Sequence, residues 1–443
     1  MALTSRAEAA GPLGPNGTPI QTSDYGIDLF QGPVLASSRV TAMGGAYSAL
    51  AEGAEGIPFN AAAASVRYPY STTRTDYDLT AGITFPGALS NTDFDNNGKI
   101  GFGYSSFLFL TGGALLQVGK FGIGANLSVQ NYSLDTPVDQ VTRTSIAGAS
   151  IRIFKIDVVA SYGFYDEQLH IGGGLRGAFI TASTGNVPIF GESLLFGSYG
   201  LGGQGGVLWT PHALPMRLGV TVRSPVIGSV SIAPSADENP AGDRIIGGLY
   251  LPQGADLPWE LEWGVAAQFG PRPLNLRWHD EDQLVGDEVE AERRIYASSN
   301  TREPPYLAAR RILQRRYRQI PRRKLLVSLS MVATGPTKNA VGIESMLTQT
   351  VDRSGQHFSY TLRGGAEAEI IPRRVQLRAG GYMEPTRFAA GNSRLHATTG
   401  IEVHIFDWDF LGIFPPESQW RVTGMLDVSR QYFGWGLGLG IWR

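Results

Sequence analysis

The sequence predicts an all-β protein, a transmembrane antiparallel β-barrel of about 14 strands with an N-terminal hatch in its lumen. Apolar and polar residues alternate with period two over segments of ten or more residues. Charged residues make up 17% of the chain, below the roughly 25% of soluble domains. The 57 glycines are nearly twice the usual share of about 7%. No apolar run reaches the ~20 residues of a membrane helix, and a barrel needs none because only alternate residues face lipid.

The N-terminal residues 1–20 are expected to be a flexible N-terminus or the remnant of a signal peptide. Residues 1–6 contain no apolar stretch, but Ala7-Glu8-Ala9 fits a signal-peptidase cleavage pattern. A cytosolic start is the alternative. The absence of Cys suits an oxidising compartment. A net charge of −2 gives no reason to expect nucleic-acid binding.

The alternation is clearest in residues 258–270, where Trp259, Leu261 and Trp263 share one face and the residues between them are mostly polar. A soluble sandwich also alternates, but its strands average about five or six residues. Segments of barrel length favour a membrane barrel. The candidate strands are 73–87, 98–119, 121–135, 144–163, 168–183, 195–210, 215–225, 258–270, 324–334, 357–370, 374–384, 394–407, 418–428 and 432–443. Residues 98–119 could instead form two short strands.

The C-terminal strand alternates Phe433, Trp435 and three aliphatic residues with four glycines. An amphipathic terminal strand with an aromatic residue near its end resembles the assembly signal of outer-membrane barrels, although Arg443 departs from the usual final aromatic residue. The glycines face the lumen and leave room for a packed segment. We therefore expect a bacterial outer-membrane protein in contact with lipids and lipopolysaccharide.

The connections predict the orientation. With both termini in the periplasm, the long links 184–194, 226–257 and 335–356 are external and most periplasmic links are short, the usual asymmetry of these barrels.

One long link, 271–323, lies on the predicted periplasmic side. Residues 280–292 are acidic and 302–324 are basic, and both have helical spacing of apolar residues, so a charged helical hairpin is expected. Its charges either pair internally or bind a periplasmic or envelope protein. The arginines expected in such docking are Arg310, Arg311, Arg315, Arg316 and Arg318.

The segment before the first strand carries a specific motif. Gly44, Gly45, Ala46 and Tyr47, followed by Asn60, resemble the hatch of the FadL/TodX family of outer-membrane transporters. Ala61 stands where that family usually has Pro. Residues 21–72 are therefore interpreted as the hatch and 73–443 as the barrel.

This resemblance implies uptake of a hydrophobic, fatty-acid-like molecule by passive diffusion past the hatch. It also implies an exit through a gap in the barrel wall at a kink in the third strand, here 121–134. Shuttle barrels of type IX secretion are similar in shape, so a non-transport scaffold or shuttle in an envelope machine is the alternative function.

Charged residues on the predicted lumen faces are expected to pair with one another or with the hatch, because an unpaired buried charge is costly. A selectivity filter for a polar solute is the alternative. The proposed network is Arg363, Glu367, Glu369, Arg378, Glu402 and His404.

Asp93, Asp95 and Asn97, with Gly98, match the opening of a calcium loop, but position 12 is Tyr104 and not Glu. A polar turn is the alternative, and no other cofactor is expected. No serine-hydrolase or zinc-protease motif is present in the sequence, so we expect a protein that is not an enzyme.

Overall fold

The computed structural model describes residues 12–68, 71, 73–87, 92–100, 102–135, 148–184, 194–232, 236–279, 284, 286–296, 304–407 and 419–442. The expectations for residues 1–11, 185–193, 280–283 and 297–303 fall outside this described part.

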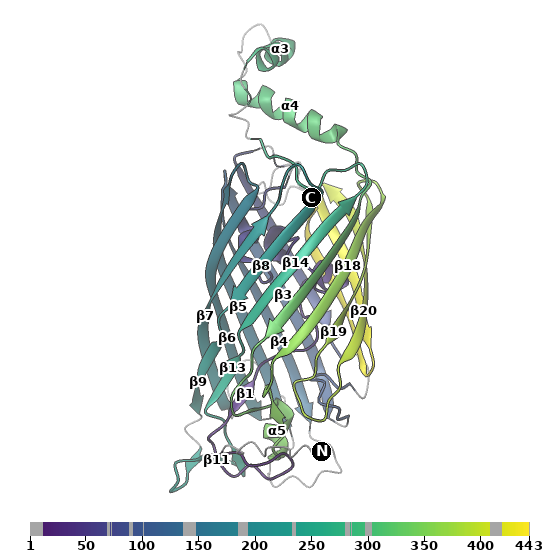
Figure 1. Ribbon diagram of the computed structural model, residues 1–443. Coiled ribbons are helices and arrows are strands. Elements are labelled where there is room, and N and C mark those ends of the chain that lie inside the picture. The colour runs from purple at the N-terminus through teal and green to yellow at the C-terminus, as the bar shows by residue number, and fades with distance from the viewer. Residues whose placement is uncertain are drawn as a thin grey trace, which may run out of the picture.

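Fourteen antiparallel strands close into one barrel (Figure 1), which confirms the predicted fold class and strand number. β2 (Thr75–Phe85) pairs with β22 (Tyr432–Trp442), so the first and last strands close the sheet. Residues 98–119 give a single strand with a register shift between Ser105 and Leu108. The strands between β2 and β22 that are unbroken are β3 (Gly103–Val118), β4 (Phe121–Asp135), β5 (Gly148–Phe164), β6 (Leu169–Thr184), β7 (Leu194–Trp209), β15 (Leu325–Thr334), β18 (Ser359–Ile371), β19 (Val375–Glu384), β20 (Arg394–Asp407) and β21 (Gln419–Ser429).

Two neighbouring barrel strands are interrupted and run further than predicted. β8 (Met216–Arg223) continues as β9 (Val226–Ile232), and β13 (Gly254–Leu257) continues as β14 (Glu260–Phe269). β9 pairs with β13, and β8 pairs with β14. Pro225 and Pro258 lie in the two breaks. Because proline cannot donate a ladder hydrogen bond, it interrupts each strand without ending it.

The outer wall of the barrel is apolar. Leu201 is 68% exposed and Leu329 is 56% exposed, whereas lumen-facing Gln130 and Glu262 are buried. Exposed aromatic residues lie toward the two ends of the strands, as in the interfacial girdles of membrane barrels. They include Phe121, Tyr162, Phe164, Trp209 and Phe269 toward one end, and Phe179, Tyr199, Phe358, Tyr360 and Trp435 toward the other. This wall is suited to lipid. Among the described residues, no helix is long and apolar enough to span a membrane.

The N-terminal segment runs into the barrel. β1 (Gly26–Asp28) pairs in parallel with β13 and with β16 (Ala340–Val341) at one mouth. The chain then forms α1 (Ser38–Ala42), α2 (Gly53–Gly56) and η1 (Ala61–Ser65), whose residues are all buried. We call residues 38–65 the hatch. Its backbone approaches barrel glycines so closely that a Cβ on Gly172 would overlap the carbonyl oxygen of Ala61.

The two ends of the barrel differ. One end carries α5 (Ile343–Thr348) with β17 (Arg353–Ser354) and a small sheet of β10 (Asp237–Glu238), β11 (Arg244–Ile246) and β12 (Leu249–Tyr250). The other carries the C-terminus, α3 (Asp287–Tyr296) and α4 (Pro305–Gln319) (Figure 1). We call them the α5 end and the α4 end.

The placement of the N-terminal residues corrects one prediction. Residues 12–20 lie at the α5 end, opposite the C-terminus, instead of on the same side (Figure 1). They are packed and not free, since Leu13 and Ile20 are almost fully buried and the Gly17 N–H donates to the carbonyl of Val351, 2.8 Å. The barrel strands still begin and end at the α4 end, so the parity of the connections is unaffected.

The predicted helical insertion is present as α3 and α4, which project beyond the barrel (Figure 1). Glu292 of α3 lies 3.5 Å from Arg311 and 2.6 Å from Arg315, and Glu288 lies 2.6 Å from Arg316. Acidic and basic helices therefore pair with each other. Tyr306 of α4 is 49% exposed.

Candidate functional site

The glycine pair of the hatch motif forms a turn that the barrel wall encloses. Gly44 and Gly45 have φ angles of 61° and 72°, which favour glycine. A Cβ on Gly44 would lie 2.7 Å from backbone atoms of Gly364 and Gly381 in β18 and β19. Ala46 and Tyr47 follow, with no exposed surface. The sequence motif therefore supplies a turn that touches the wall.

Asn60, the last residue of the motif, hydrogen-bonds to three separate parts of the backbone. Its Oδ1 accepts the N–H of Ala62, 3.0 Å, and so caps η1. Its Nδ2 donates to the carbonyl of Ser48 in the hatch, 3.0 Å, and of Val207 in β7, 3.2 Å. This one side chain fixes both the shape of the hatch and its position against the wall.

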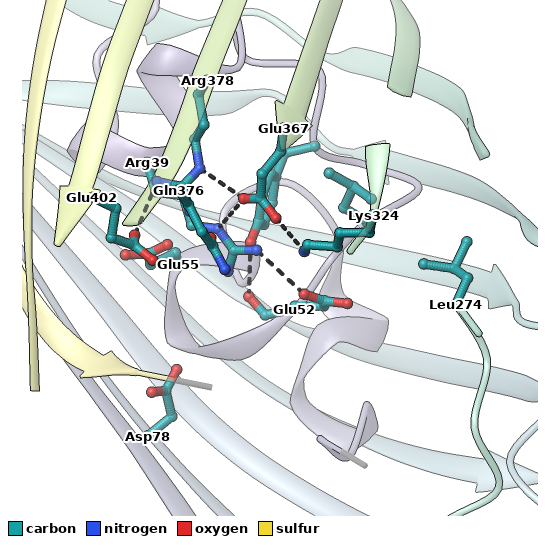
Figure 2. Close-up of polar contacts among 12 residues, drawn as sticks. Arg39, Glu52, Glu55, Asp78, Leu274, Lys324, Glu367, Gln376, Arg378 and Glu402 are labelled. Carbon is teal, nitrogen blue, oxygen red and sulfur yellow. Dashed lines mark hydrogen bonds and ion pairs between the residues drawn. The ribbon is translucent and has the colours of Figure 1, made fainter. Parts of the chain in front are cut away.

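A continuous chain of ion pairs connects the hatch with lumen-facing side chains of the barrel strands. Arg39 of α1 lies 3.4 Å from Glu52 of the hatch and 3.4 Å from Glu367 of β18 (Figure 2). Glu367 also pairs with Lys324 and with Arg378 of β19, 2.7 Å from the latter. Arg39, Glu367 and Arg378 are buried, and their charges are tolerated because they are paired.

The chain of ion pairs returns to the hatch. Arg378 lies 3.0 Å from Glu402 of β20, and Glu402 lies 2.7 Å from Arg421 of β21. Arg421 then lies 2.7 Å from Glu55 of α2. On the opposite wall, Arg217 of β8 pairs with Glu52, 2.8 Å. The barrel thus holds the hatch by buried charges on both sides.

The structure brings together three of the six lumen charges proposed from the sequence: Glu367, Arg378 and Glu402. Glu369 pairs with Arg272, 3.4 Å, outside this chain of ion pairs. His404 lies apart, with its Nδ1 3.2 Å from the carbonyl oxygen of Arg373. Sequence reasoning missed the hatch partners, which are Arg39, Glu52 and Glu55. Their charges within a segment rich in Gly and Ala were the available signal.

A second buried cluster joins the wall to the segment before the hatch. The two ring nitrogens of His396 lie 2.8 Å from Asp427 and 2.7 Å from Glu384. An imidazole donates to two acceptors at once only as the imidazolium, so the geometry indicates a charged His396. Tyr382 donates its hydroxyl to Asp427, 2.7 Å, and accepts the N–H of Val34, 3.1 Å.

Two cavities lie between the hatch and the α5 end. The outer cavity is lined by aromatic residues that include Phe94, Tyr104 and Tyr132, and by the charged residues Asp28, Asp95, Glu344 and Arg387. The inner cavity reaches the hatch at Pro58 and Phe59.

Phe30 and Gln31 line both cavities and separate them. The guanidinium of Arg387 lies over the Phe30 ring at 4.9 Å. Gln31 contacts Gln130 and accepts from Lys155, 2.9 Å. These two cavities therefore meet at Phe30 and Gln31, and the inner one lies against the hatch.

The wall gap implied for the third strand is not present. β4 pairs without a register shift with β5 over the whole of Phe121–Asp135. It also pairs with β3 through the middle of the membrane-facing wall. The expectation of a kink at 121–134 is therefore wrong for this chain. The interruptions at Pro225 and Pro258 lie elsewhere, and Pro258 lines the inner cavity.

The residues of the candidate calcium loop are hydrogen-bonded within the protein. Each Asp93 oxygen accepts a backbone N–H, from Asn97 and from Gly98, 3.0 Å each. The Asn97 amide donates to Glu344 of α5, 2.6 Å. In the part of the chain that the structure describes, no group of three or more His, Cys, Asp or Glu residues is arranged to hold a metal ion. Calcium binding by this loop stays a prediction.

The five arginines proposed for docking all lie on α4. Arg315 and Arg316 are 58% and 52% exposed at their side chains but are paired with α3, as is Arg311. The backbone carbonyl of Arg318 accepts a hydrogen bond from the guanidinium of Arg373, 3.1 Å, so α4 contacts the barrel rim.

Comparisons with known proteins give one set of similar structures. No protein-family model matches the sequence, and a comparison with curated proteins gives no match. Among solved structures, the chain is similar to the CymD monoaromatic hydrocarbon channel at 10% identity, covering 92% of this chain and 97% of that one, with a TM-score of 0.49.

Two further structures are similar over most of their length. A FadL homologue from Pseudomonas aeruginosa has 11% identity, coverage of 96% and 98%, and a TM-score of 0.49. The deltaS2 mutant of the TodX monoaromatic hydrocarbon channel has 11% identity, coverage of 91% and 96%, and a TM-score of 0.46. The chain is thus similar to channels of the FadL/TodX kind, which its hatch motif also resembles.

Proposed function

We propose that this protein is an integral outer-membrane channel for small hydrophobic molecules, in which the hatch controls passage. The observation that carries this proposal is the series of two cavities between the α5 end and the hatch. The α5 end is external and the α4 end is periplasmic, following the parity of the connections. Lipids and lipopolysaccharide surround the apolar wall.

The route follows from the lining of the lumen. A molecule enters the outer cavity, where aromatic side chains cover its apolar surface. It passes Phe30 and Gln31 into the inner cavity and then meets the hatch. Movement is by passive diffusion, and displacement of the hatch is the step that opens the periplasmic side.

An uptake assay tests this function with a matched pair of variants on β4. Ser128 lines the inner cavity, whereas the adjacent Leu127 is 37% exposed on the outer wall. Ser128→Trp fills the cavity and Leu127→Trp adds the same bulk toward lipid. In a Gram-negative host without its own channels for such compounds, we expect tracer toluene or oleate uptake with wild type and Leu127→Trp, and its loss with Ser128→Trp. Equal uptake by both variants and by cells without the protein would refute transport.

A scaffold or shuttle role is the second candidate, and the α3–α4 hairpin favours it. The hairpin leaves Ile295 72% exposed and Tyr306 49% exposed beyond the barrel. These groups and the exposed arginines of α4 suit a periplasmic or envelope protein. Removing residues 284–319 should then abolish co-purification with that protein and leave uptake intact. Unchanged co-purification would exclude docking through the hairpin.

A further inference from the structure

The inner cavity carries charges of both signs in equal number. Its basic residues come from three strands of one wall and one of another, and its acidic residues come from the hatch and two strands. The basic residues are Lys155, Arg176, Arg223 and Arg363, and the acidic residues are Glu55, Asp157, Glu260 and Glu262. A cavity that binds only hydrocarbons is not expected to carry eight charged groups, because each group loses its hydration when an apolar molecule replaces water.

Two ion pairs that face this cavity are long. Arg176 lies 3.7 Å from Glu260, and Arg363 lies 3.7 Å from Glu262. Both separations are too long for a hydrogen bond. Arg378, in comparison, lies 2.7 Å from Glu367 and 3.0 Å from Glu402.

Four buried atoms of residues that line the inner cavity have no hydrogen-bond partner within the protein. They are Nη1 of Arg176, Nε of Arg363, Oε1 of Glu262 and Oε2 of Glu55. Buried polar atoms are nearly always satisfied in native proteins, so a ligand or ordered water is expected to complete them. Two are donors and two are acceptors.

These unpartnered donors and acceptors indicate which class of solute the inner cavity can bind. A carboxylate would satisfy the two guanidinium donors but would face the free oxygen of Glu262. An ammonium would satisfy Glu262 but would face the two guanidinium groups. A molecule with both groups offers partners to the donors and to the acceptors, and Phe59 and Phe109 in the same cavity offer apolar surface beside them.

We infer that the inner cavity binds a small amphipathic zwitterion, a molecule with an ammonium group, a carboxylate and an apolar or aromatic part. This inference rests on the proposed function and narrows its substrate class. The aromatic outer cavity takes the apolar part first, and the inner cavity then pairs both charges. A purely apolar molecule passes the same route without filling the polar site.

Four probes with the same ring separate the alternatives: phenylalanine, 3-phenylpropionate, phenethylamine and toluene. Equilibrium dialysis with the full-length protein in detergent should show phenylalanine binding at least tenfold more tightly than either singly charged probe. Arg363→Gln should weaken phenylalanine binding about tenfold and leave phenethylamine binding unchanged. Glu262→Gln should weaken phenylalanine and phenethylamine and spare 3-phenylpropionate.

Controls keep the two proposals separable. Glu262 also pairs with Arg223, 3.1 Å, so folding of each variant is checked by heat-modifiable migration on a gel, and Arg316→Gln on α4 serves as a distant control. Toluene uptake without preferential phenylalanine binding would overturn the zwitterion site and leave the channel standing. Preferential binding without uptake of any probe would overturn the channel and leave the site standing. Equal binding of all four probes would mean that water fills the polar site, which also overturns the inference.

Discussion

Arg421 is the most informative residue to change, because it links the ion pairs of the barrel wall to Glu55 of the hatch. Arg421→Met leaves Glu55, which is 6% exposed, without its guanidinium partner. Removing one partner of a buried ion pair costs about 3–5 kcal/mol. Glu55 keeps the hydroxyl of Thr80 at 3.1 Å, and Glu402 keeps Arg378 at 3.0 Å, so the lower figure applies. If the state with the hatch in place is destabilised by about 3 kcal/mol, the population with the hatch displaced is roughly a hundredfold larger.

Single-channel recording in planar bilayers measures this population. We expect the open probability of Arg421→Met to rise about a hundredfold over wild type at the same voltage and salt, by the energy above. The double variant Glu55→Gln/Arg421→Met removes both charges, and we expect it to lie near wild type because no unpaired charge remains. The reasoning is refuted if Arg421→Met opens no more often than wild type. It is also refuted if the double variant opens as often as the single one.

Three other changes test separate parts of the structure. Gly172→Ala should displace η1 and expose the hatch to protease, whereas Gly173→Ala, with its nearest neighbour 3.6 Å away, should not; equal cleavage would contradict the close approach. Asn60→Ala removes a helix cap worth about 0.5–2 kcal/mol as well as two backbone bonds, so hatch proteolysis should accelerate at least tenfold, and an unchanged rate would show that the cap is dispensable. Burial raises the pKa of Glu344 to about 7, so the folded chain holds a proton there that the unfolded chain releases near 4.5. The packing of α5 is therefore strongest below that value and weakens as the pH rises through 7. The hydrogen-exchange protection factors of α5, which are corrected for the intrinsic pH dependence of exchange, should fall from pH 5 to 8 in wild type and stay level in Glu344→Gln; the same fall in the variant would contradict this assignment.

The barrel could be predicted because period-two alternation is a local property of each strand. Pro225 and Pro258 made two strands look shorter than they are, since a proline normally ends a pattern. The pairing of β9 with β13 and with β7 shows that the strands continue. The direction in which the N-terminal segment threads the barrel could not be read locally, because β1 is placed by parallel pairing with strands more than 200 residues away.

The sequence predicts which residues lie on the lumen faces of the strands, but it does not predict which of these residues pair with one another. Strand parity places Glu367, Arg378 and Glu402 in the lumen. Which charges meet depends on closure of the barrel and on the hatch, whose Arg39 and Glu55 come from a segment without strand periodicity. The hatch motif was found by resemblance, and its wall contacts explain the residue types: Gly44 for a turn against backbone, and Asn60 for three bonds.

Locking the hatch to the wall tests the central claim, that the hatch closes the route through the barrel. Ser65 of η1 and His170 of β6 lie side by side, with Oγ 2.9 Å from Nδ1, and the chain has no Cys of its own. In cells carrying Ser65→Cys/His170→Cys, we expect toluene uptake to fall to the level of cells without the protein on oxidation and to return on reduction. The single variant Ser65→Cys should be insensitive to both treatments. Uptake that continues at the wild-type rate with the cross-link fully formed would contradict the account.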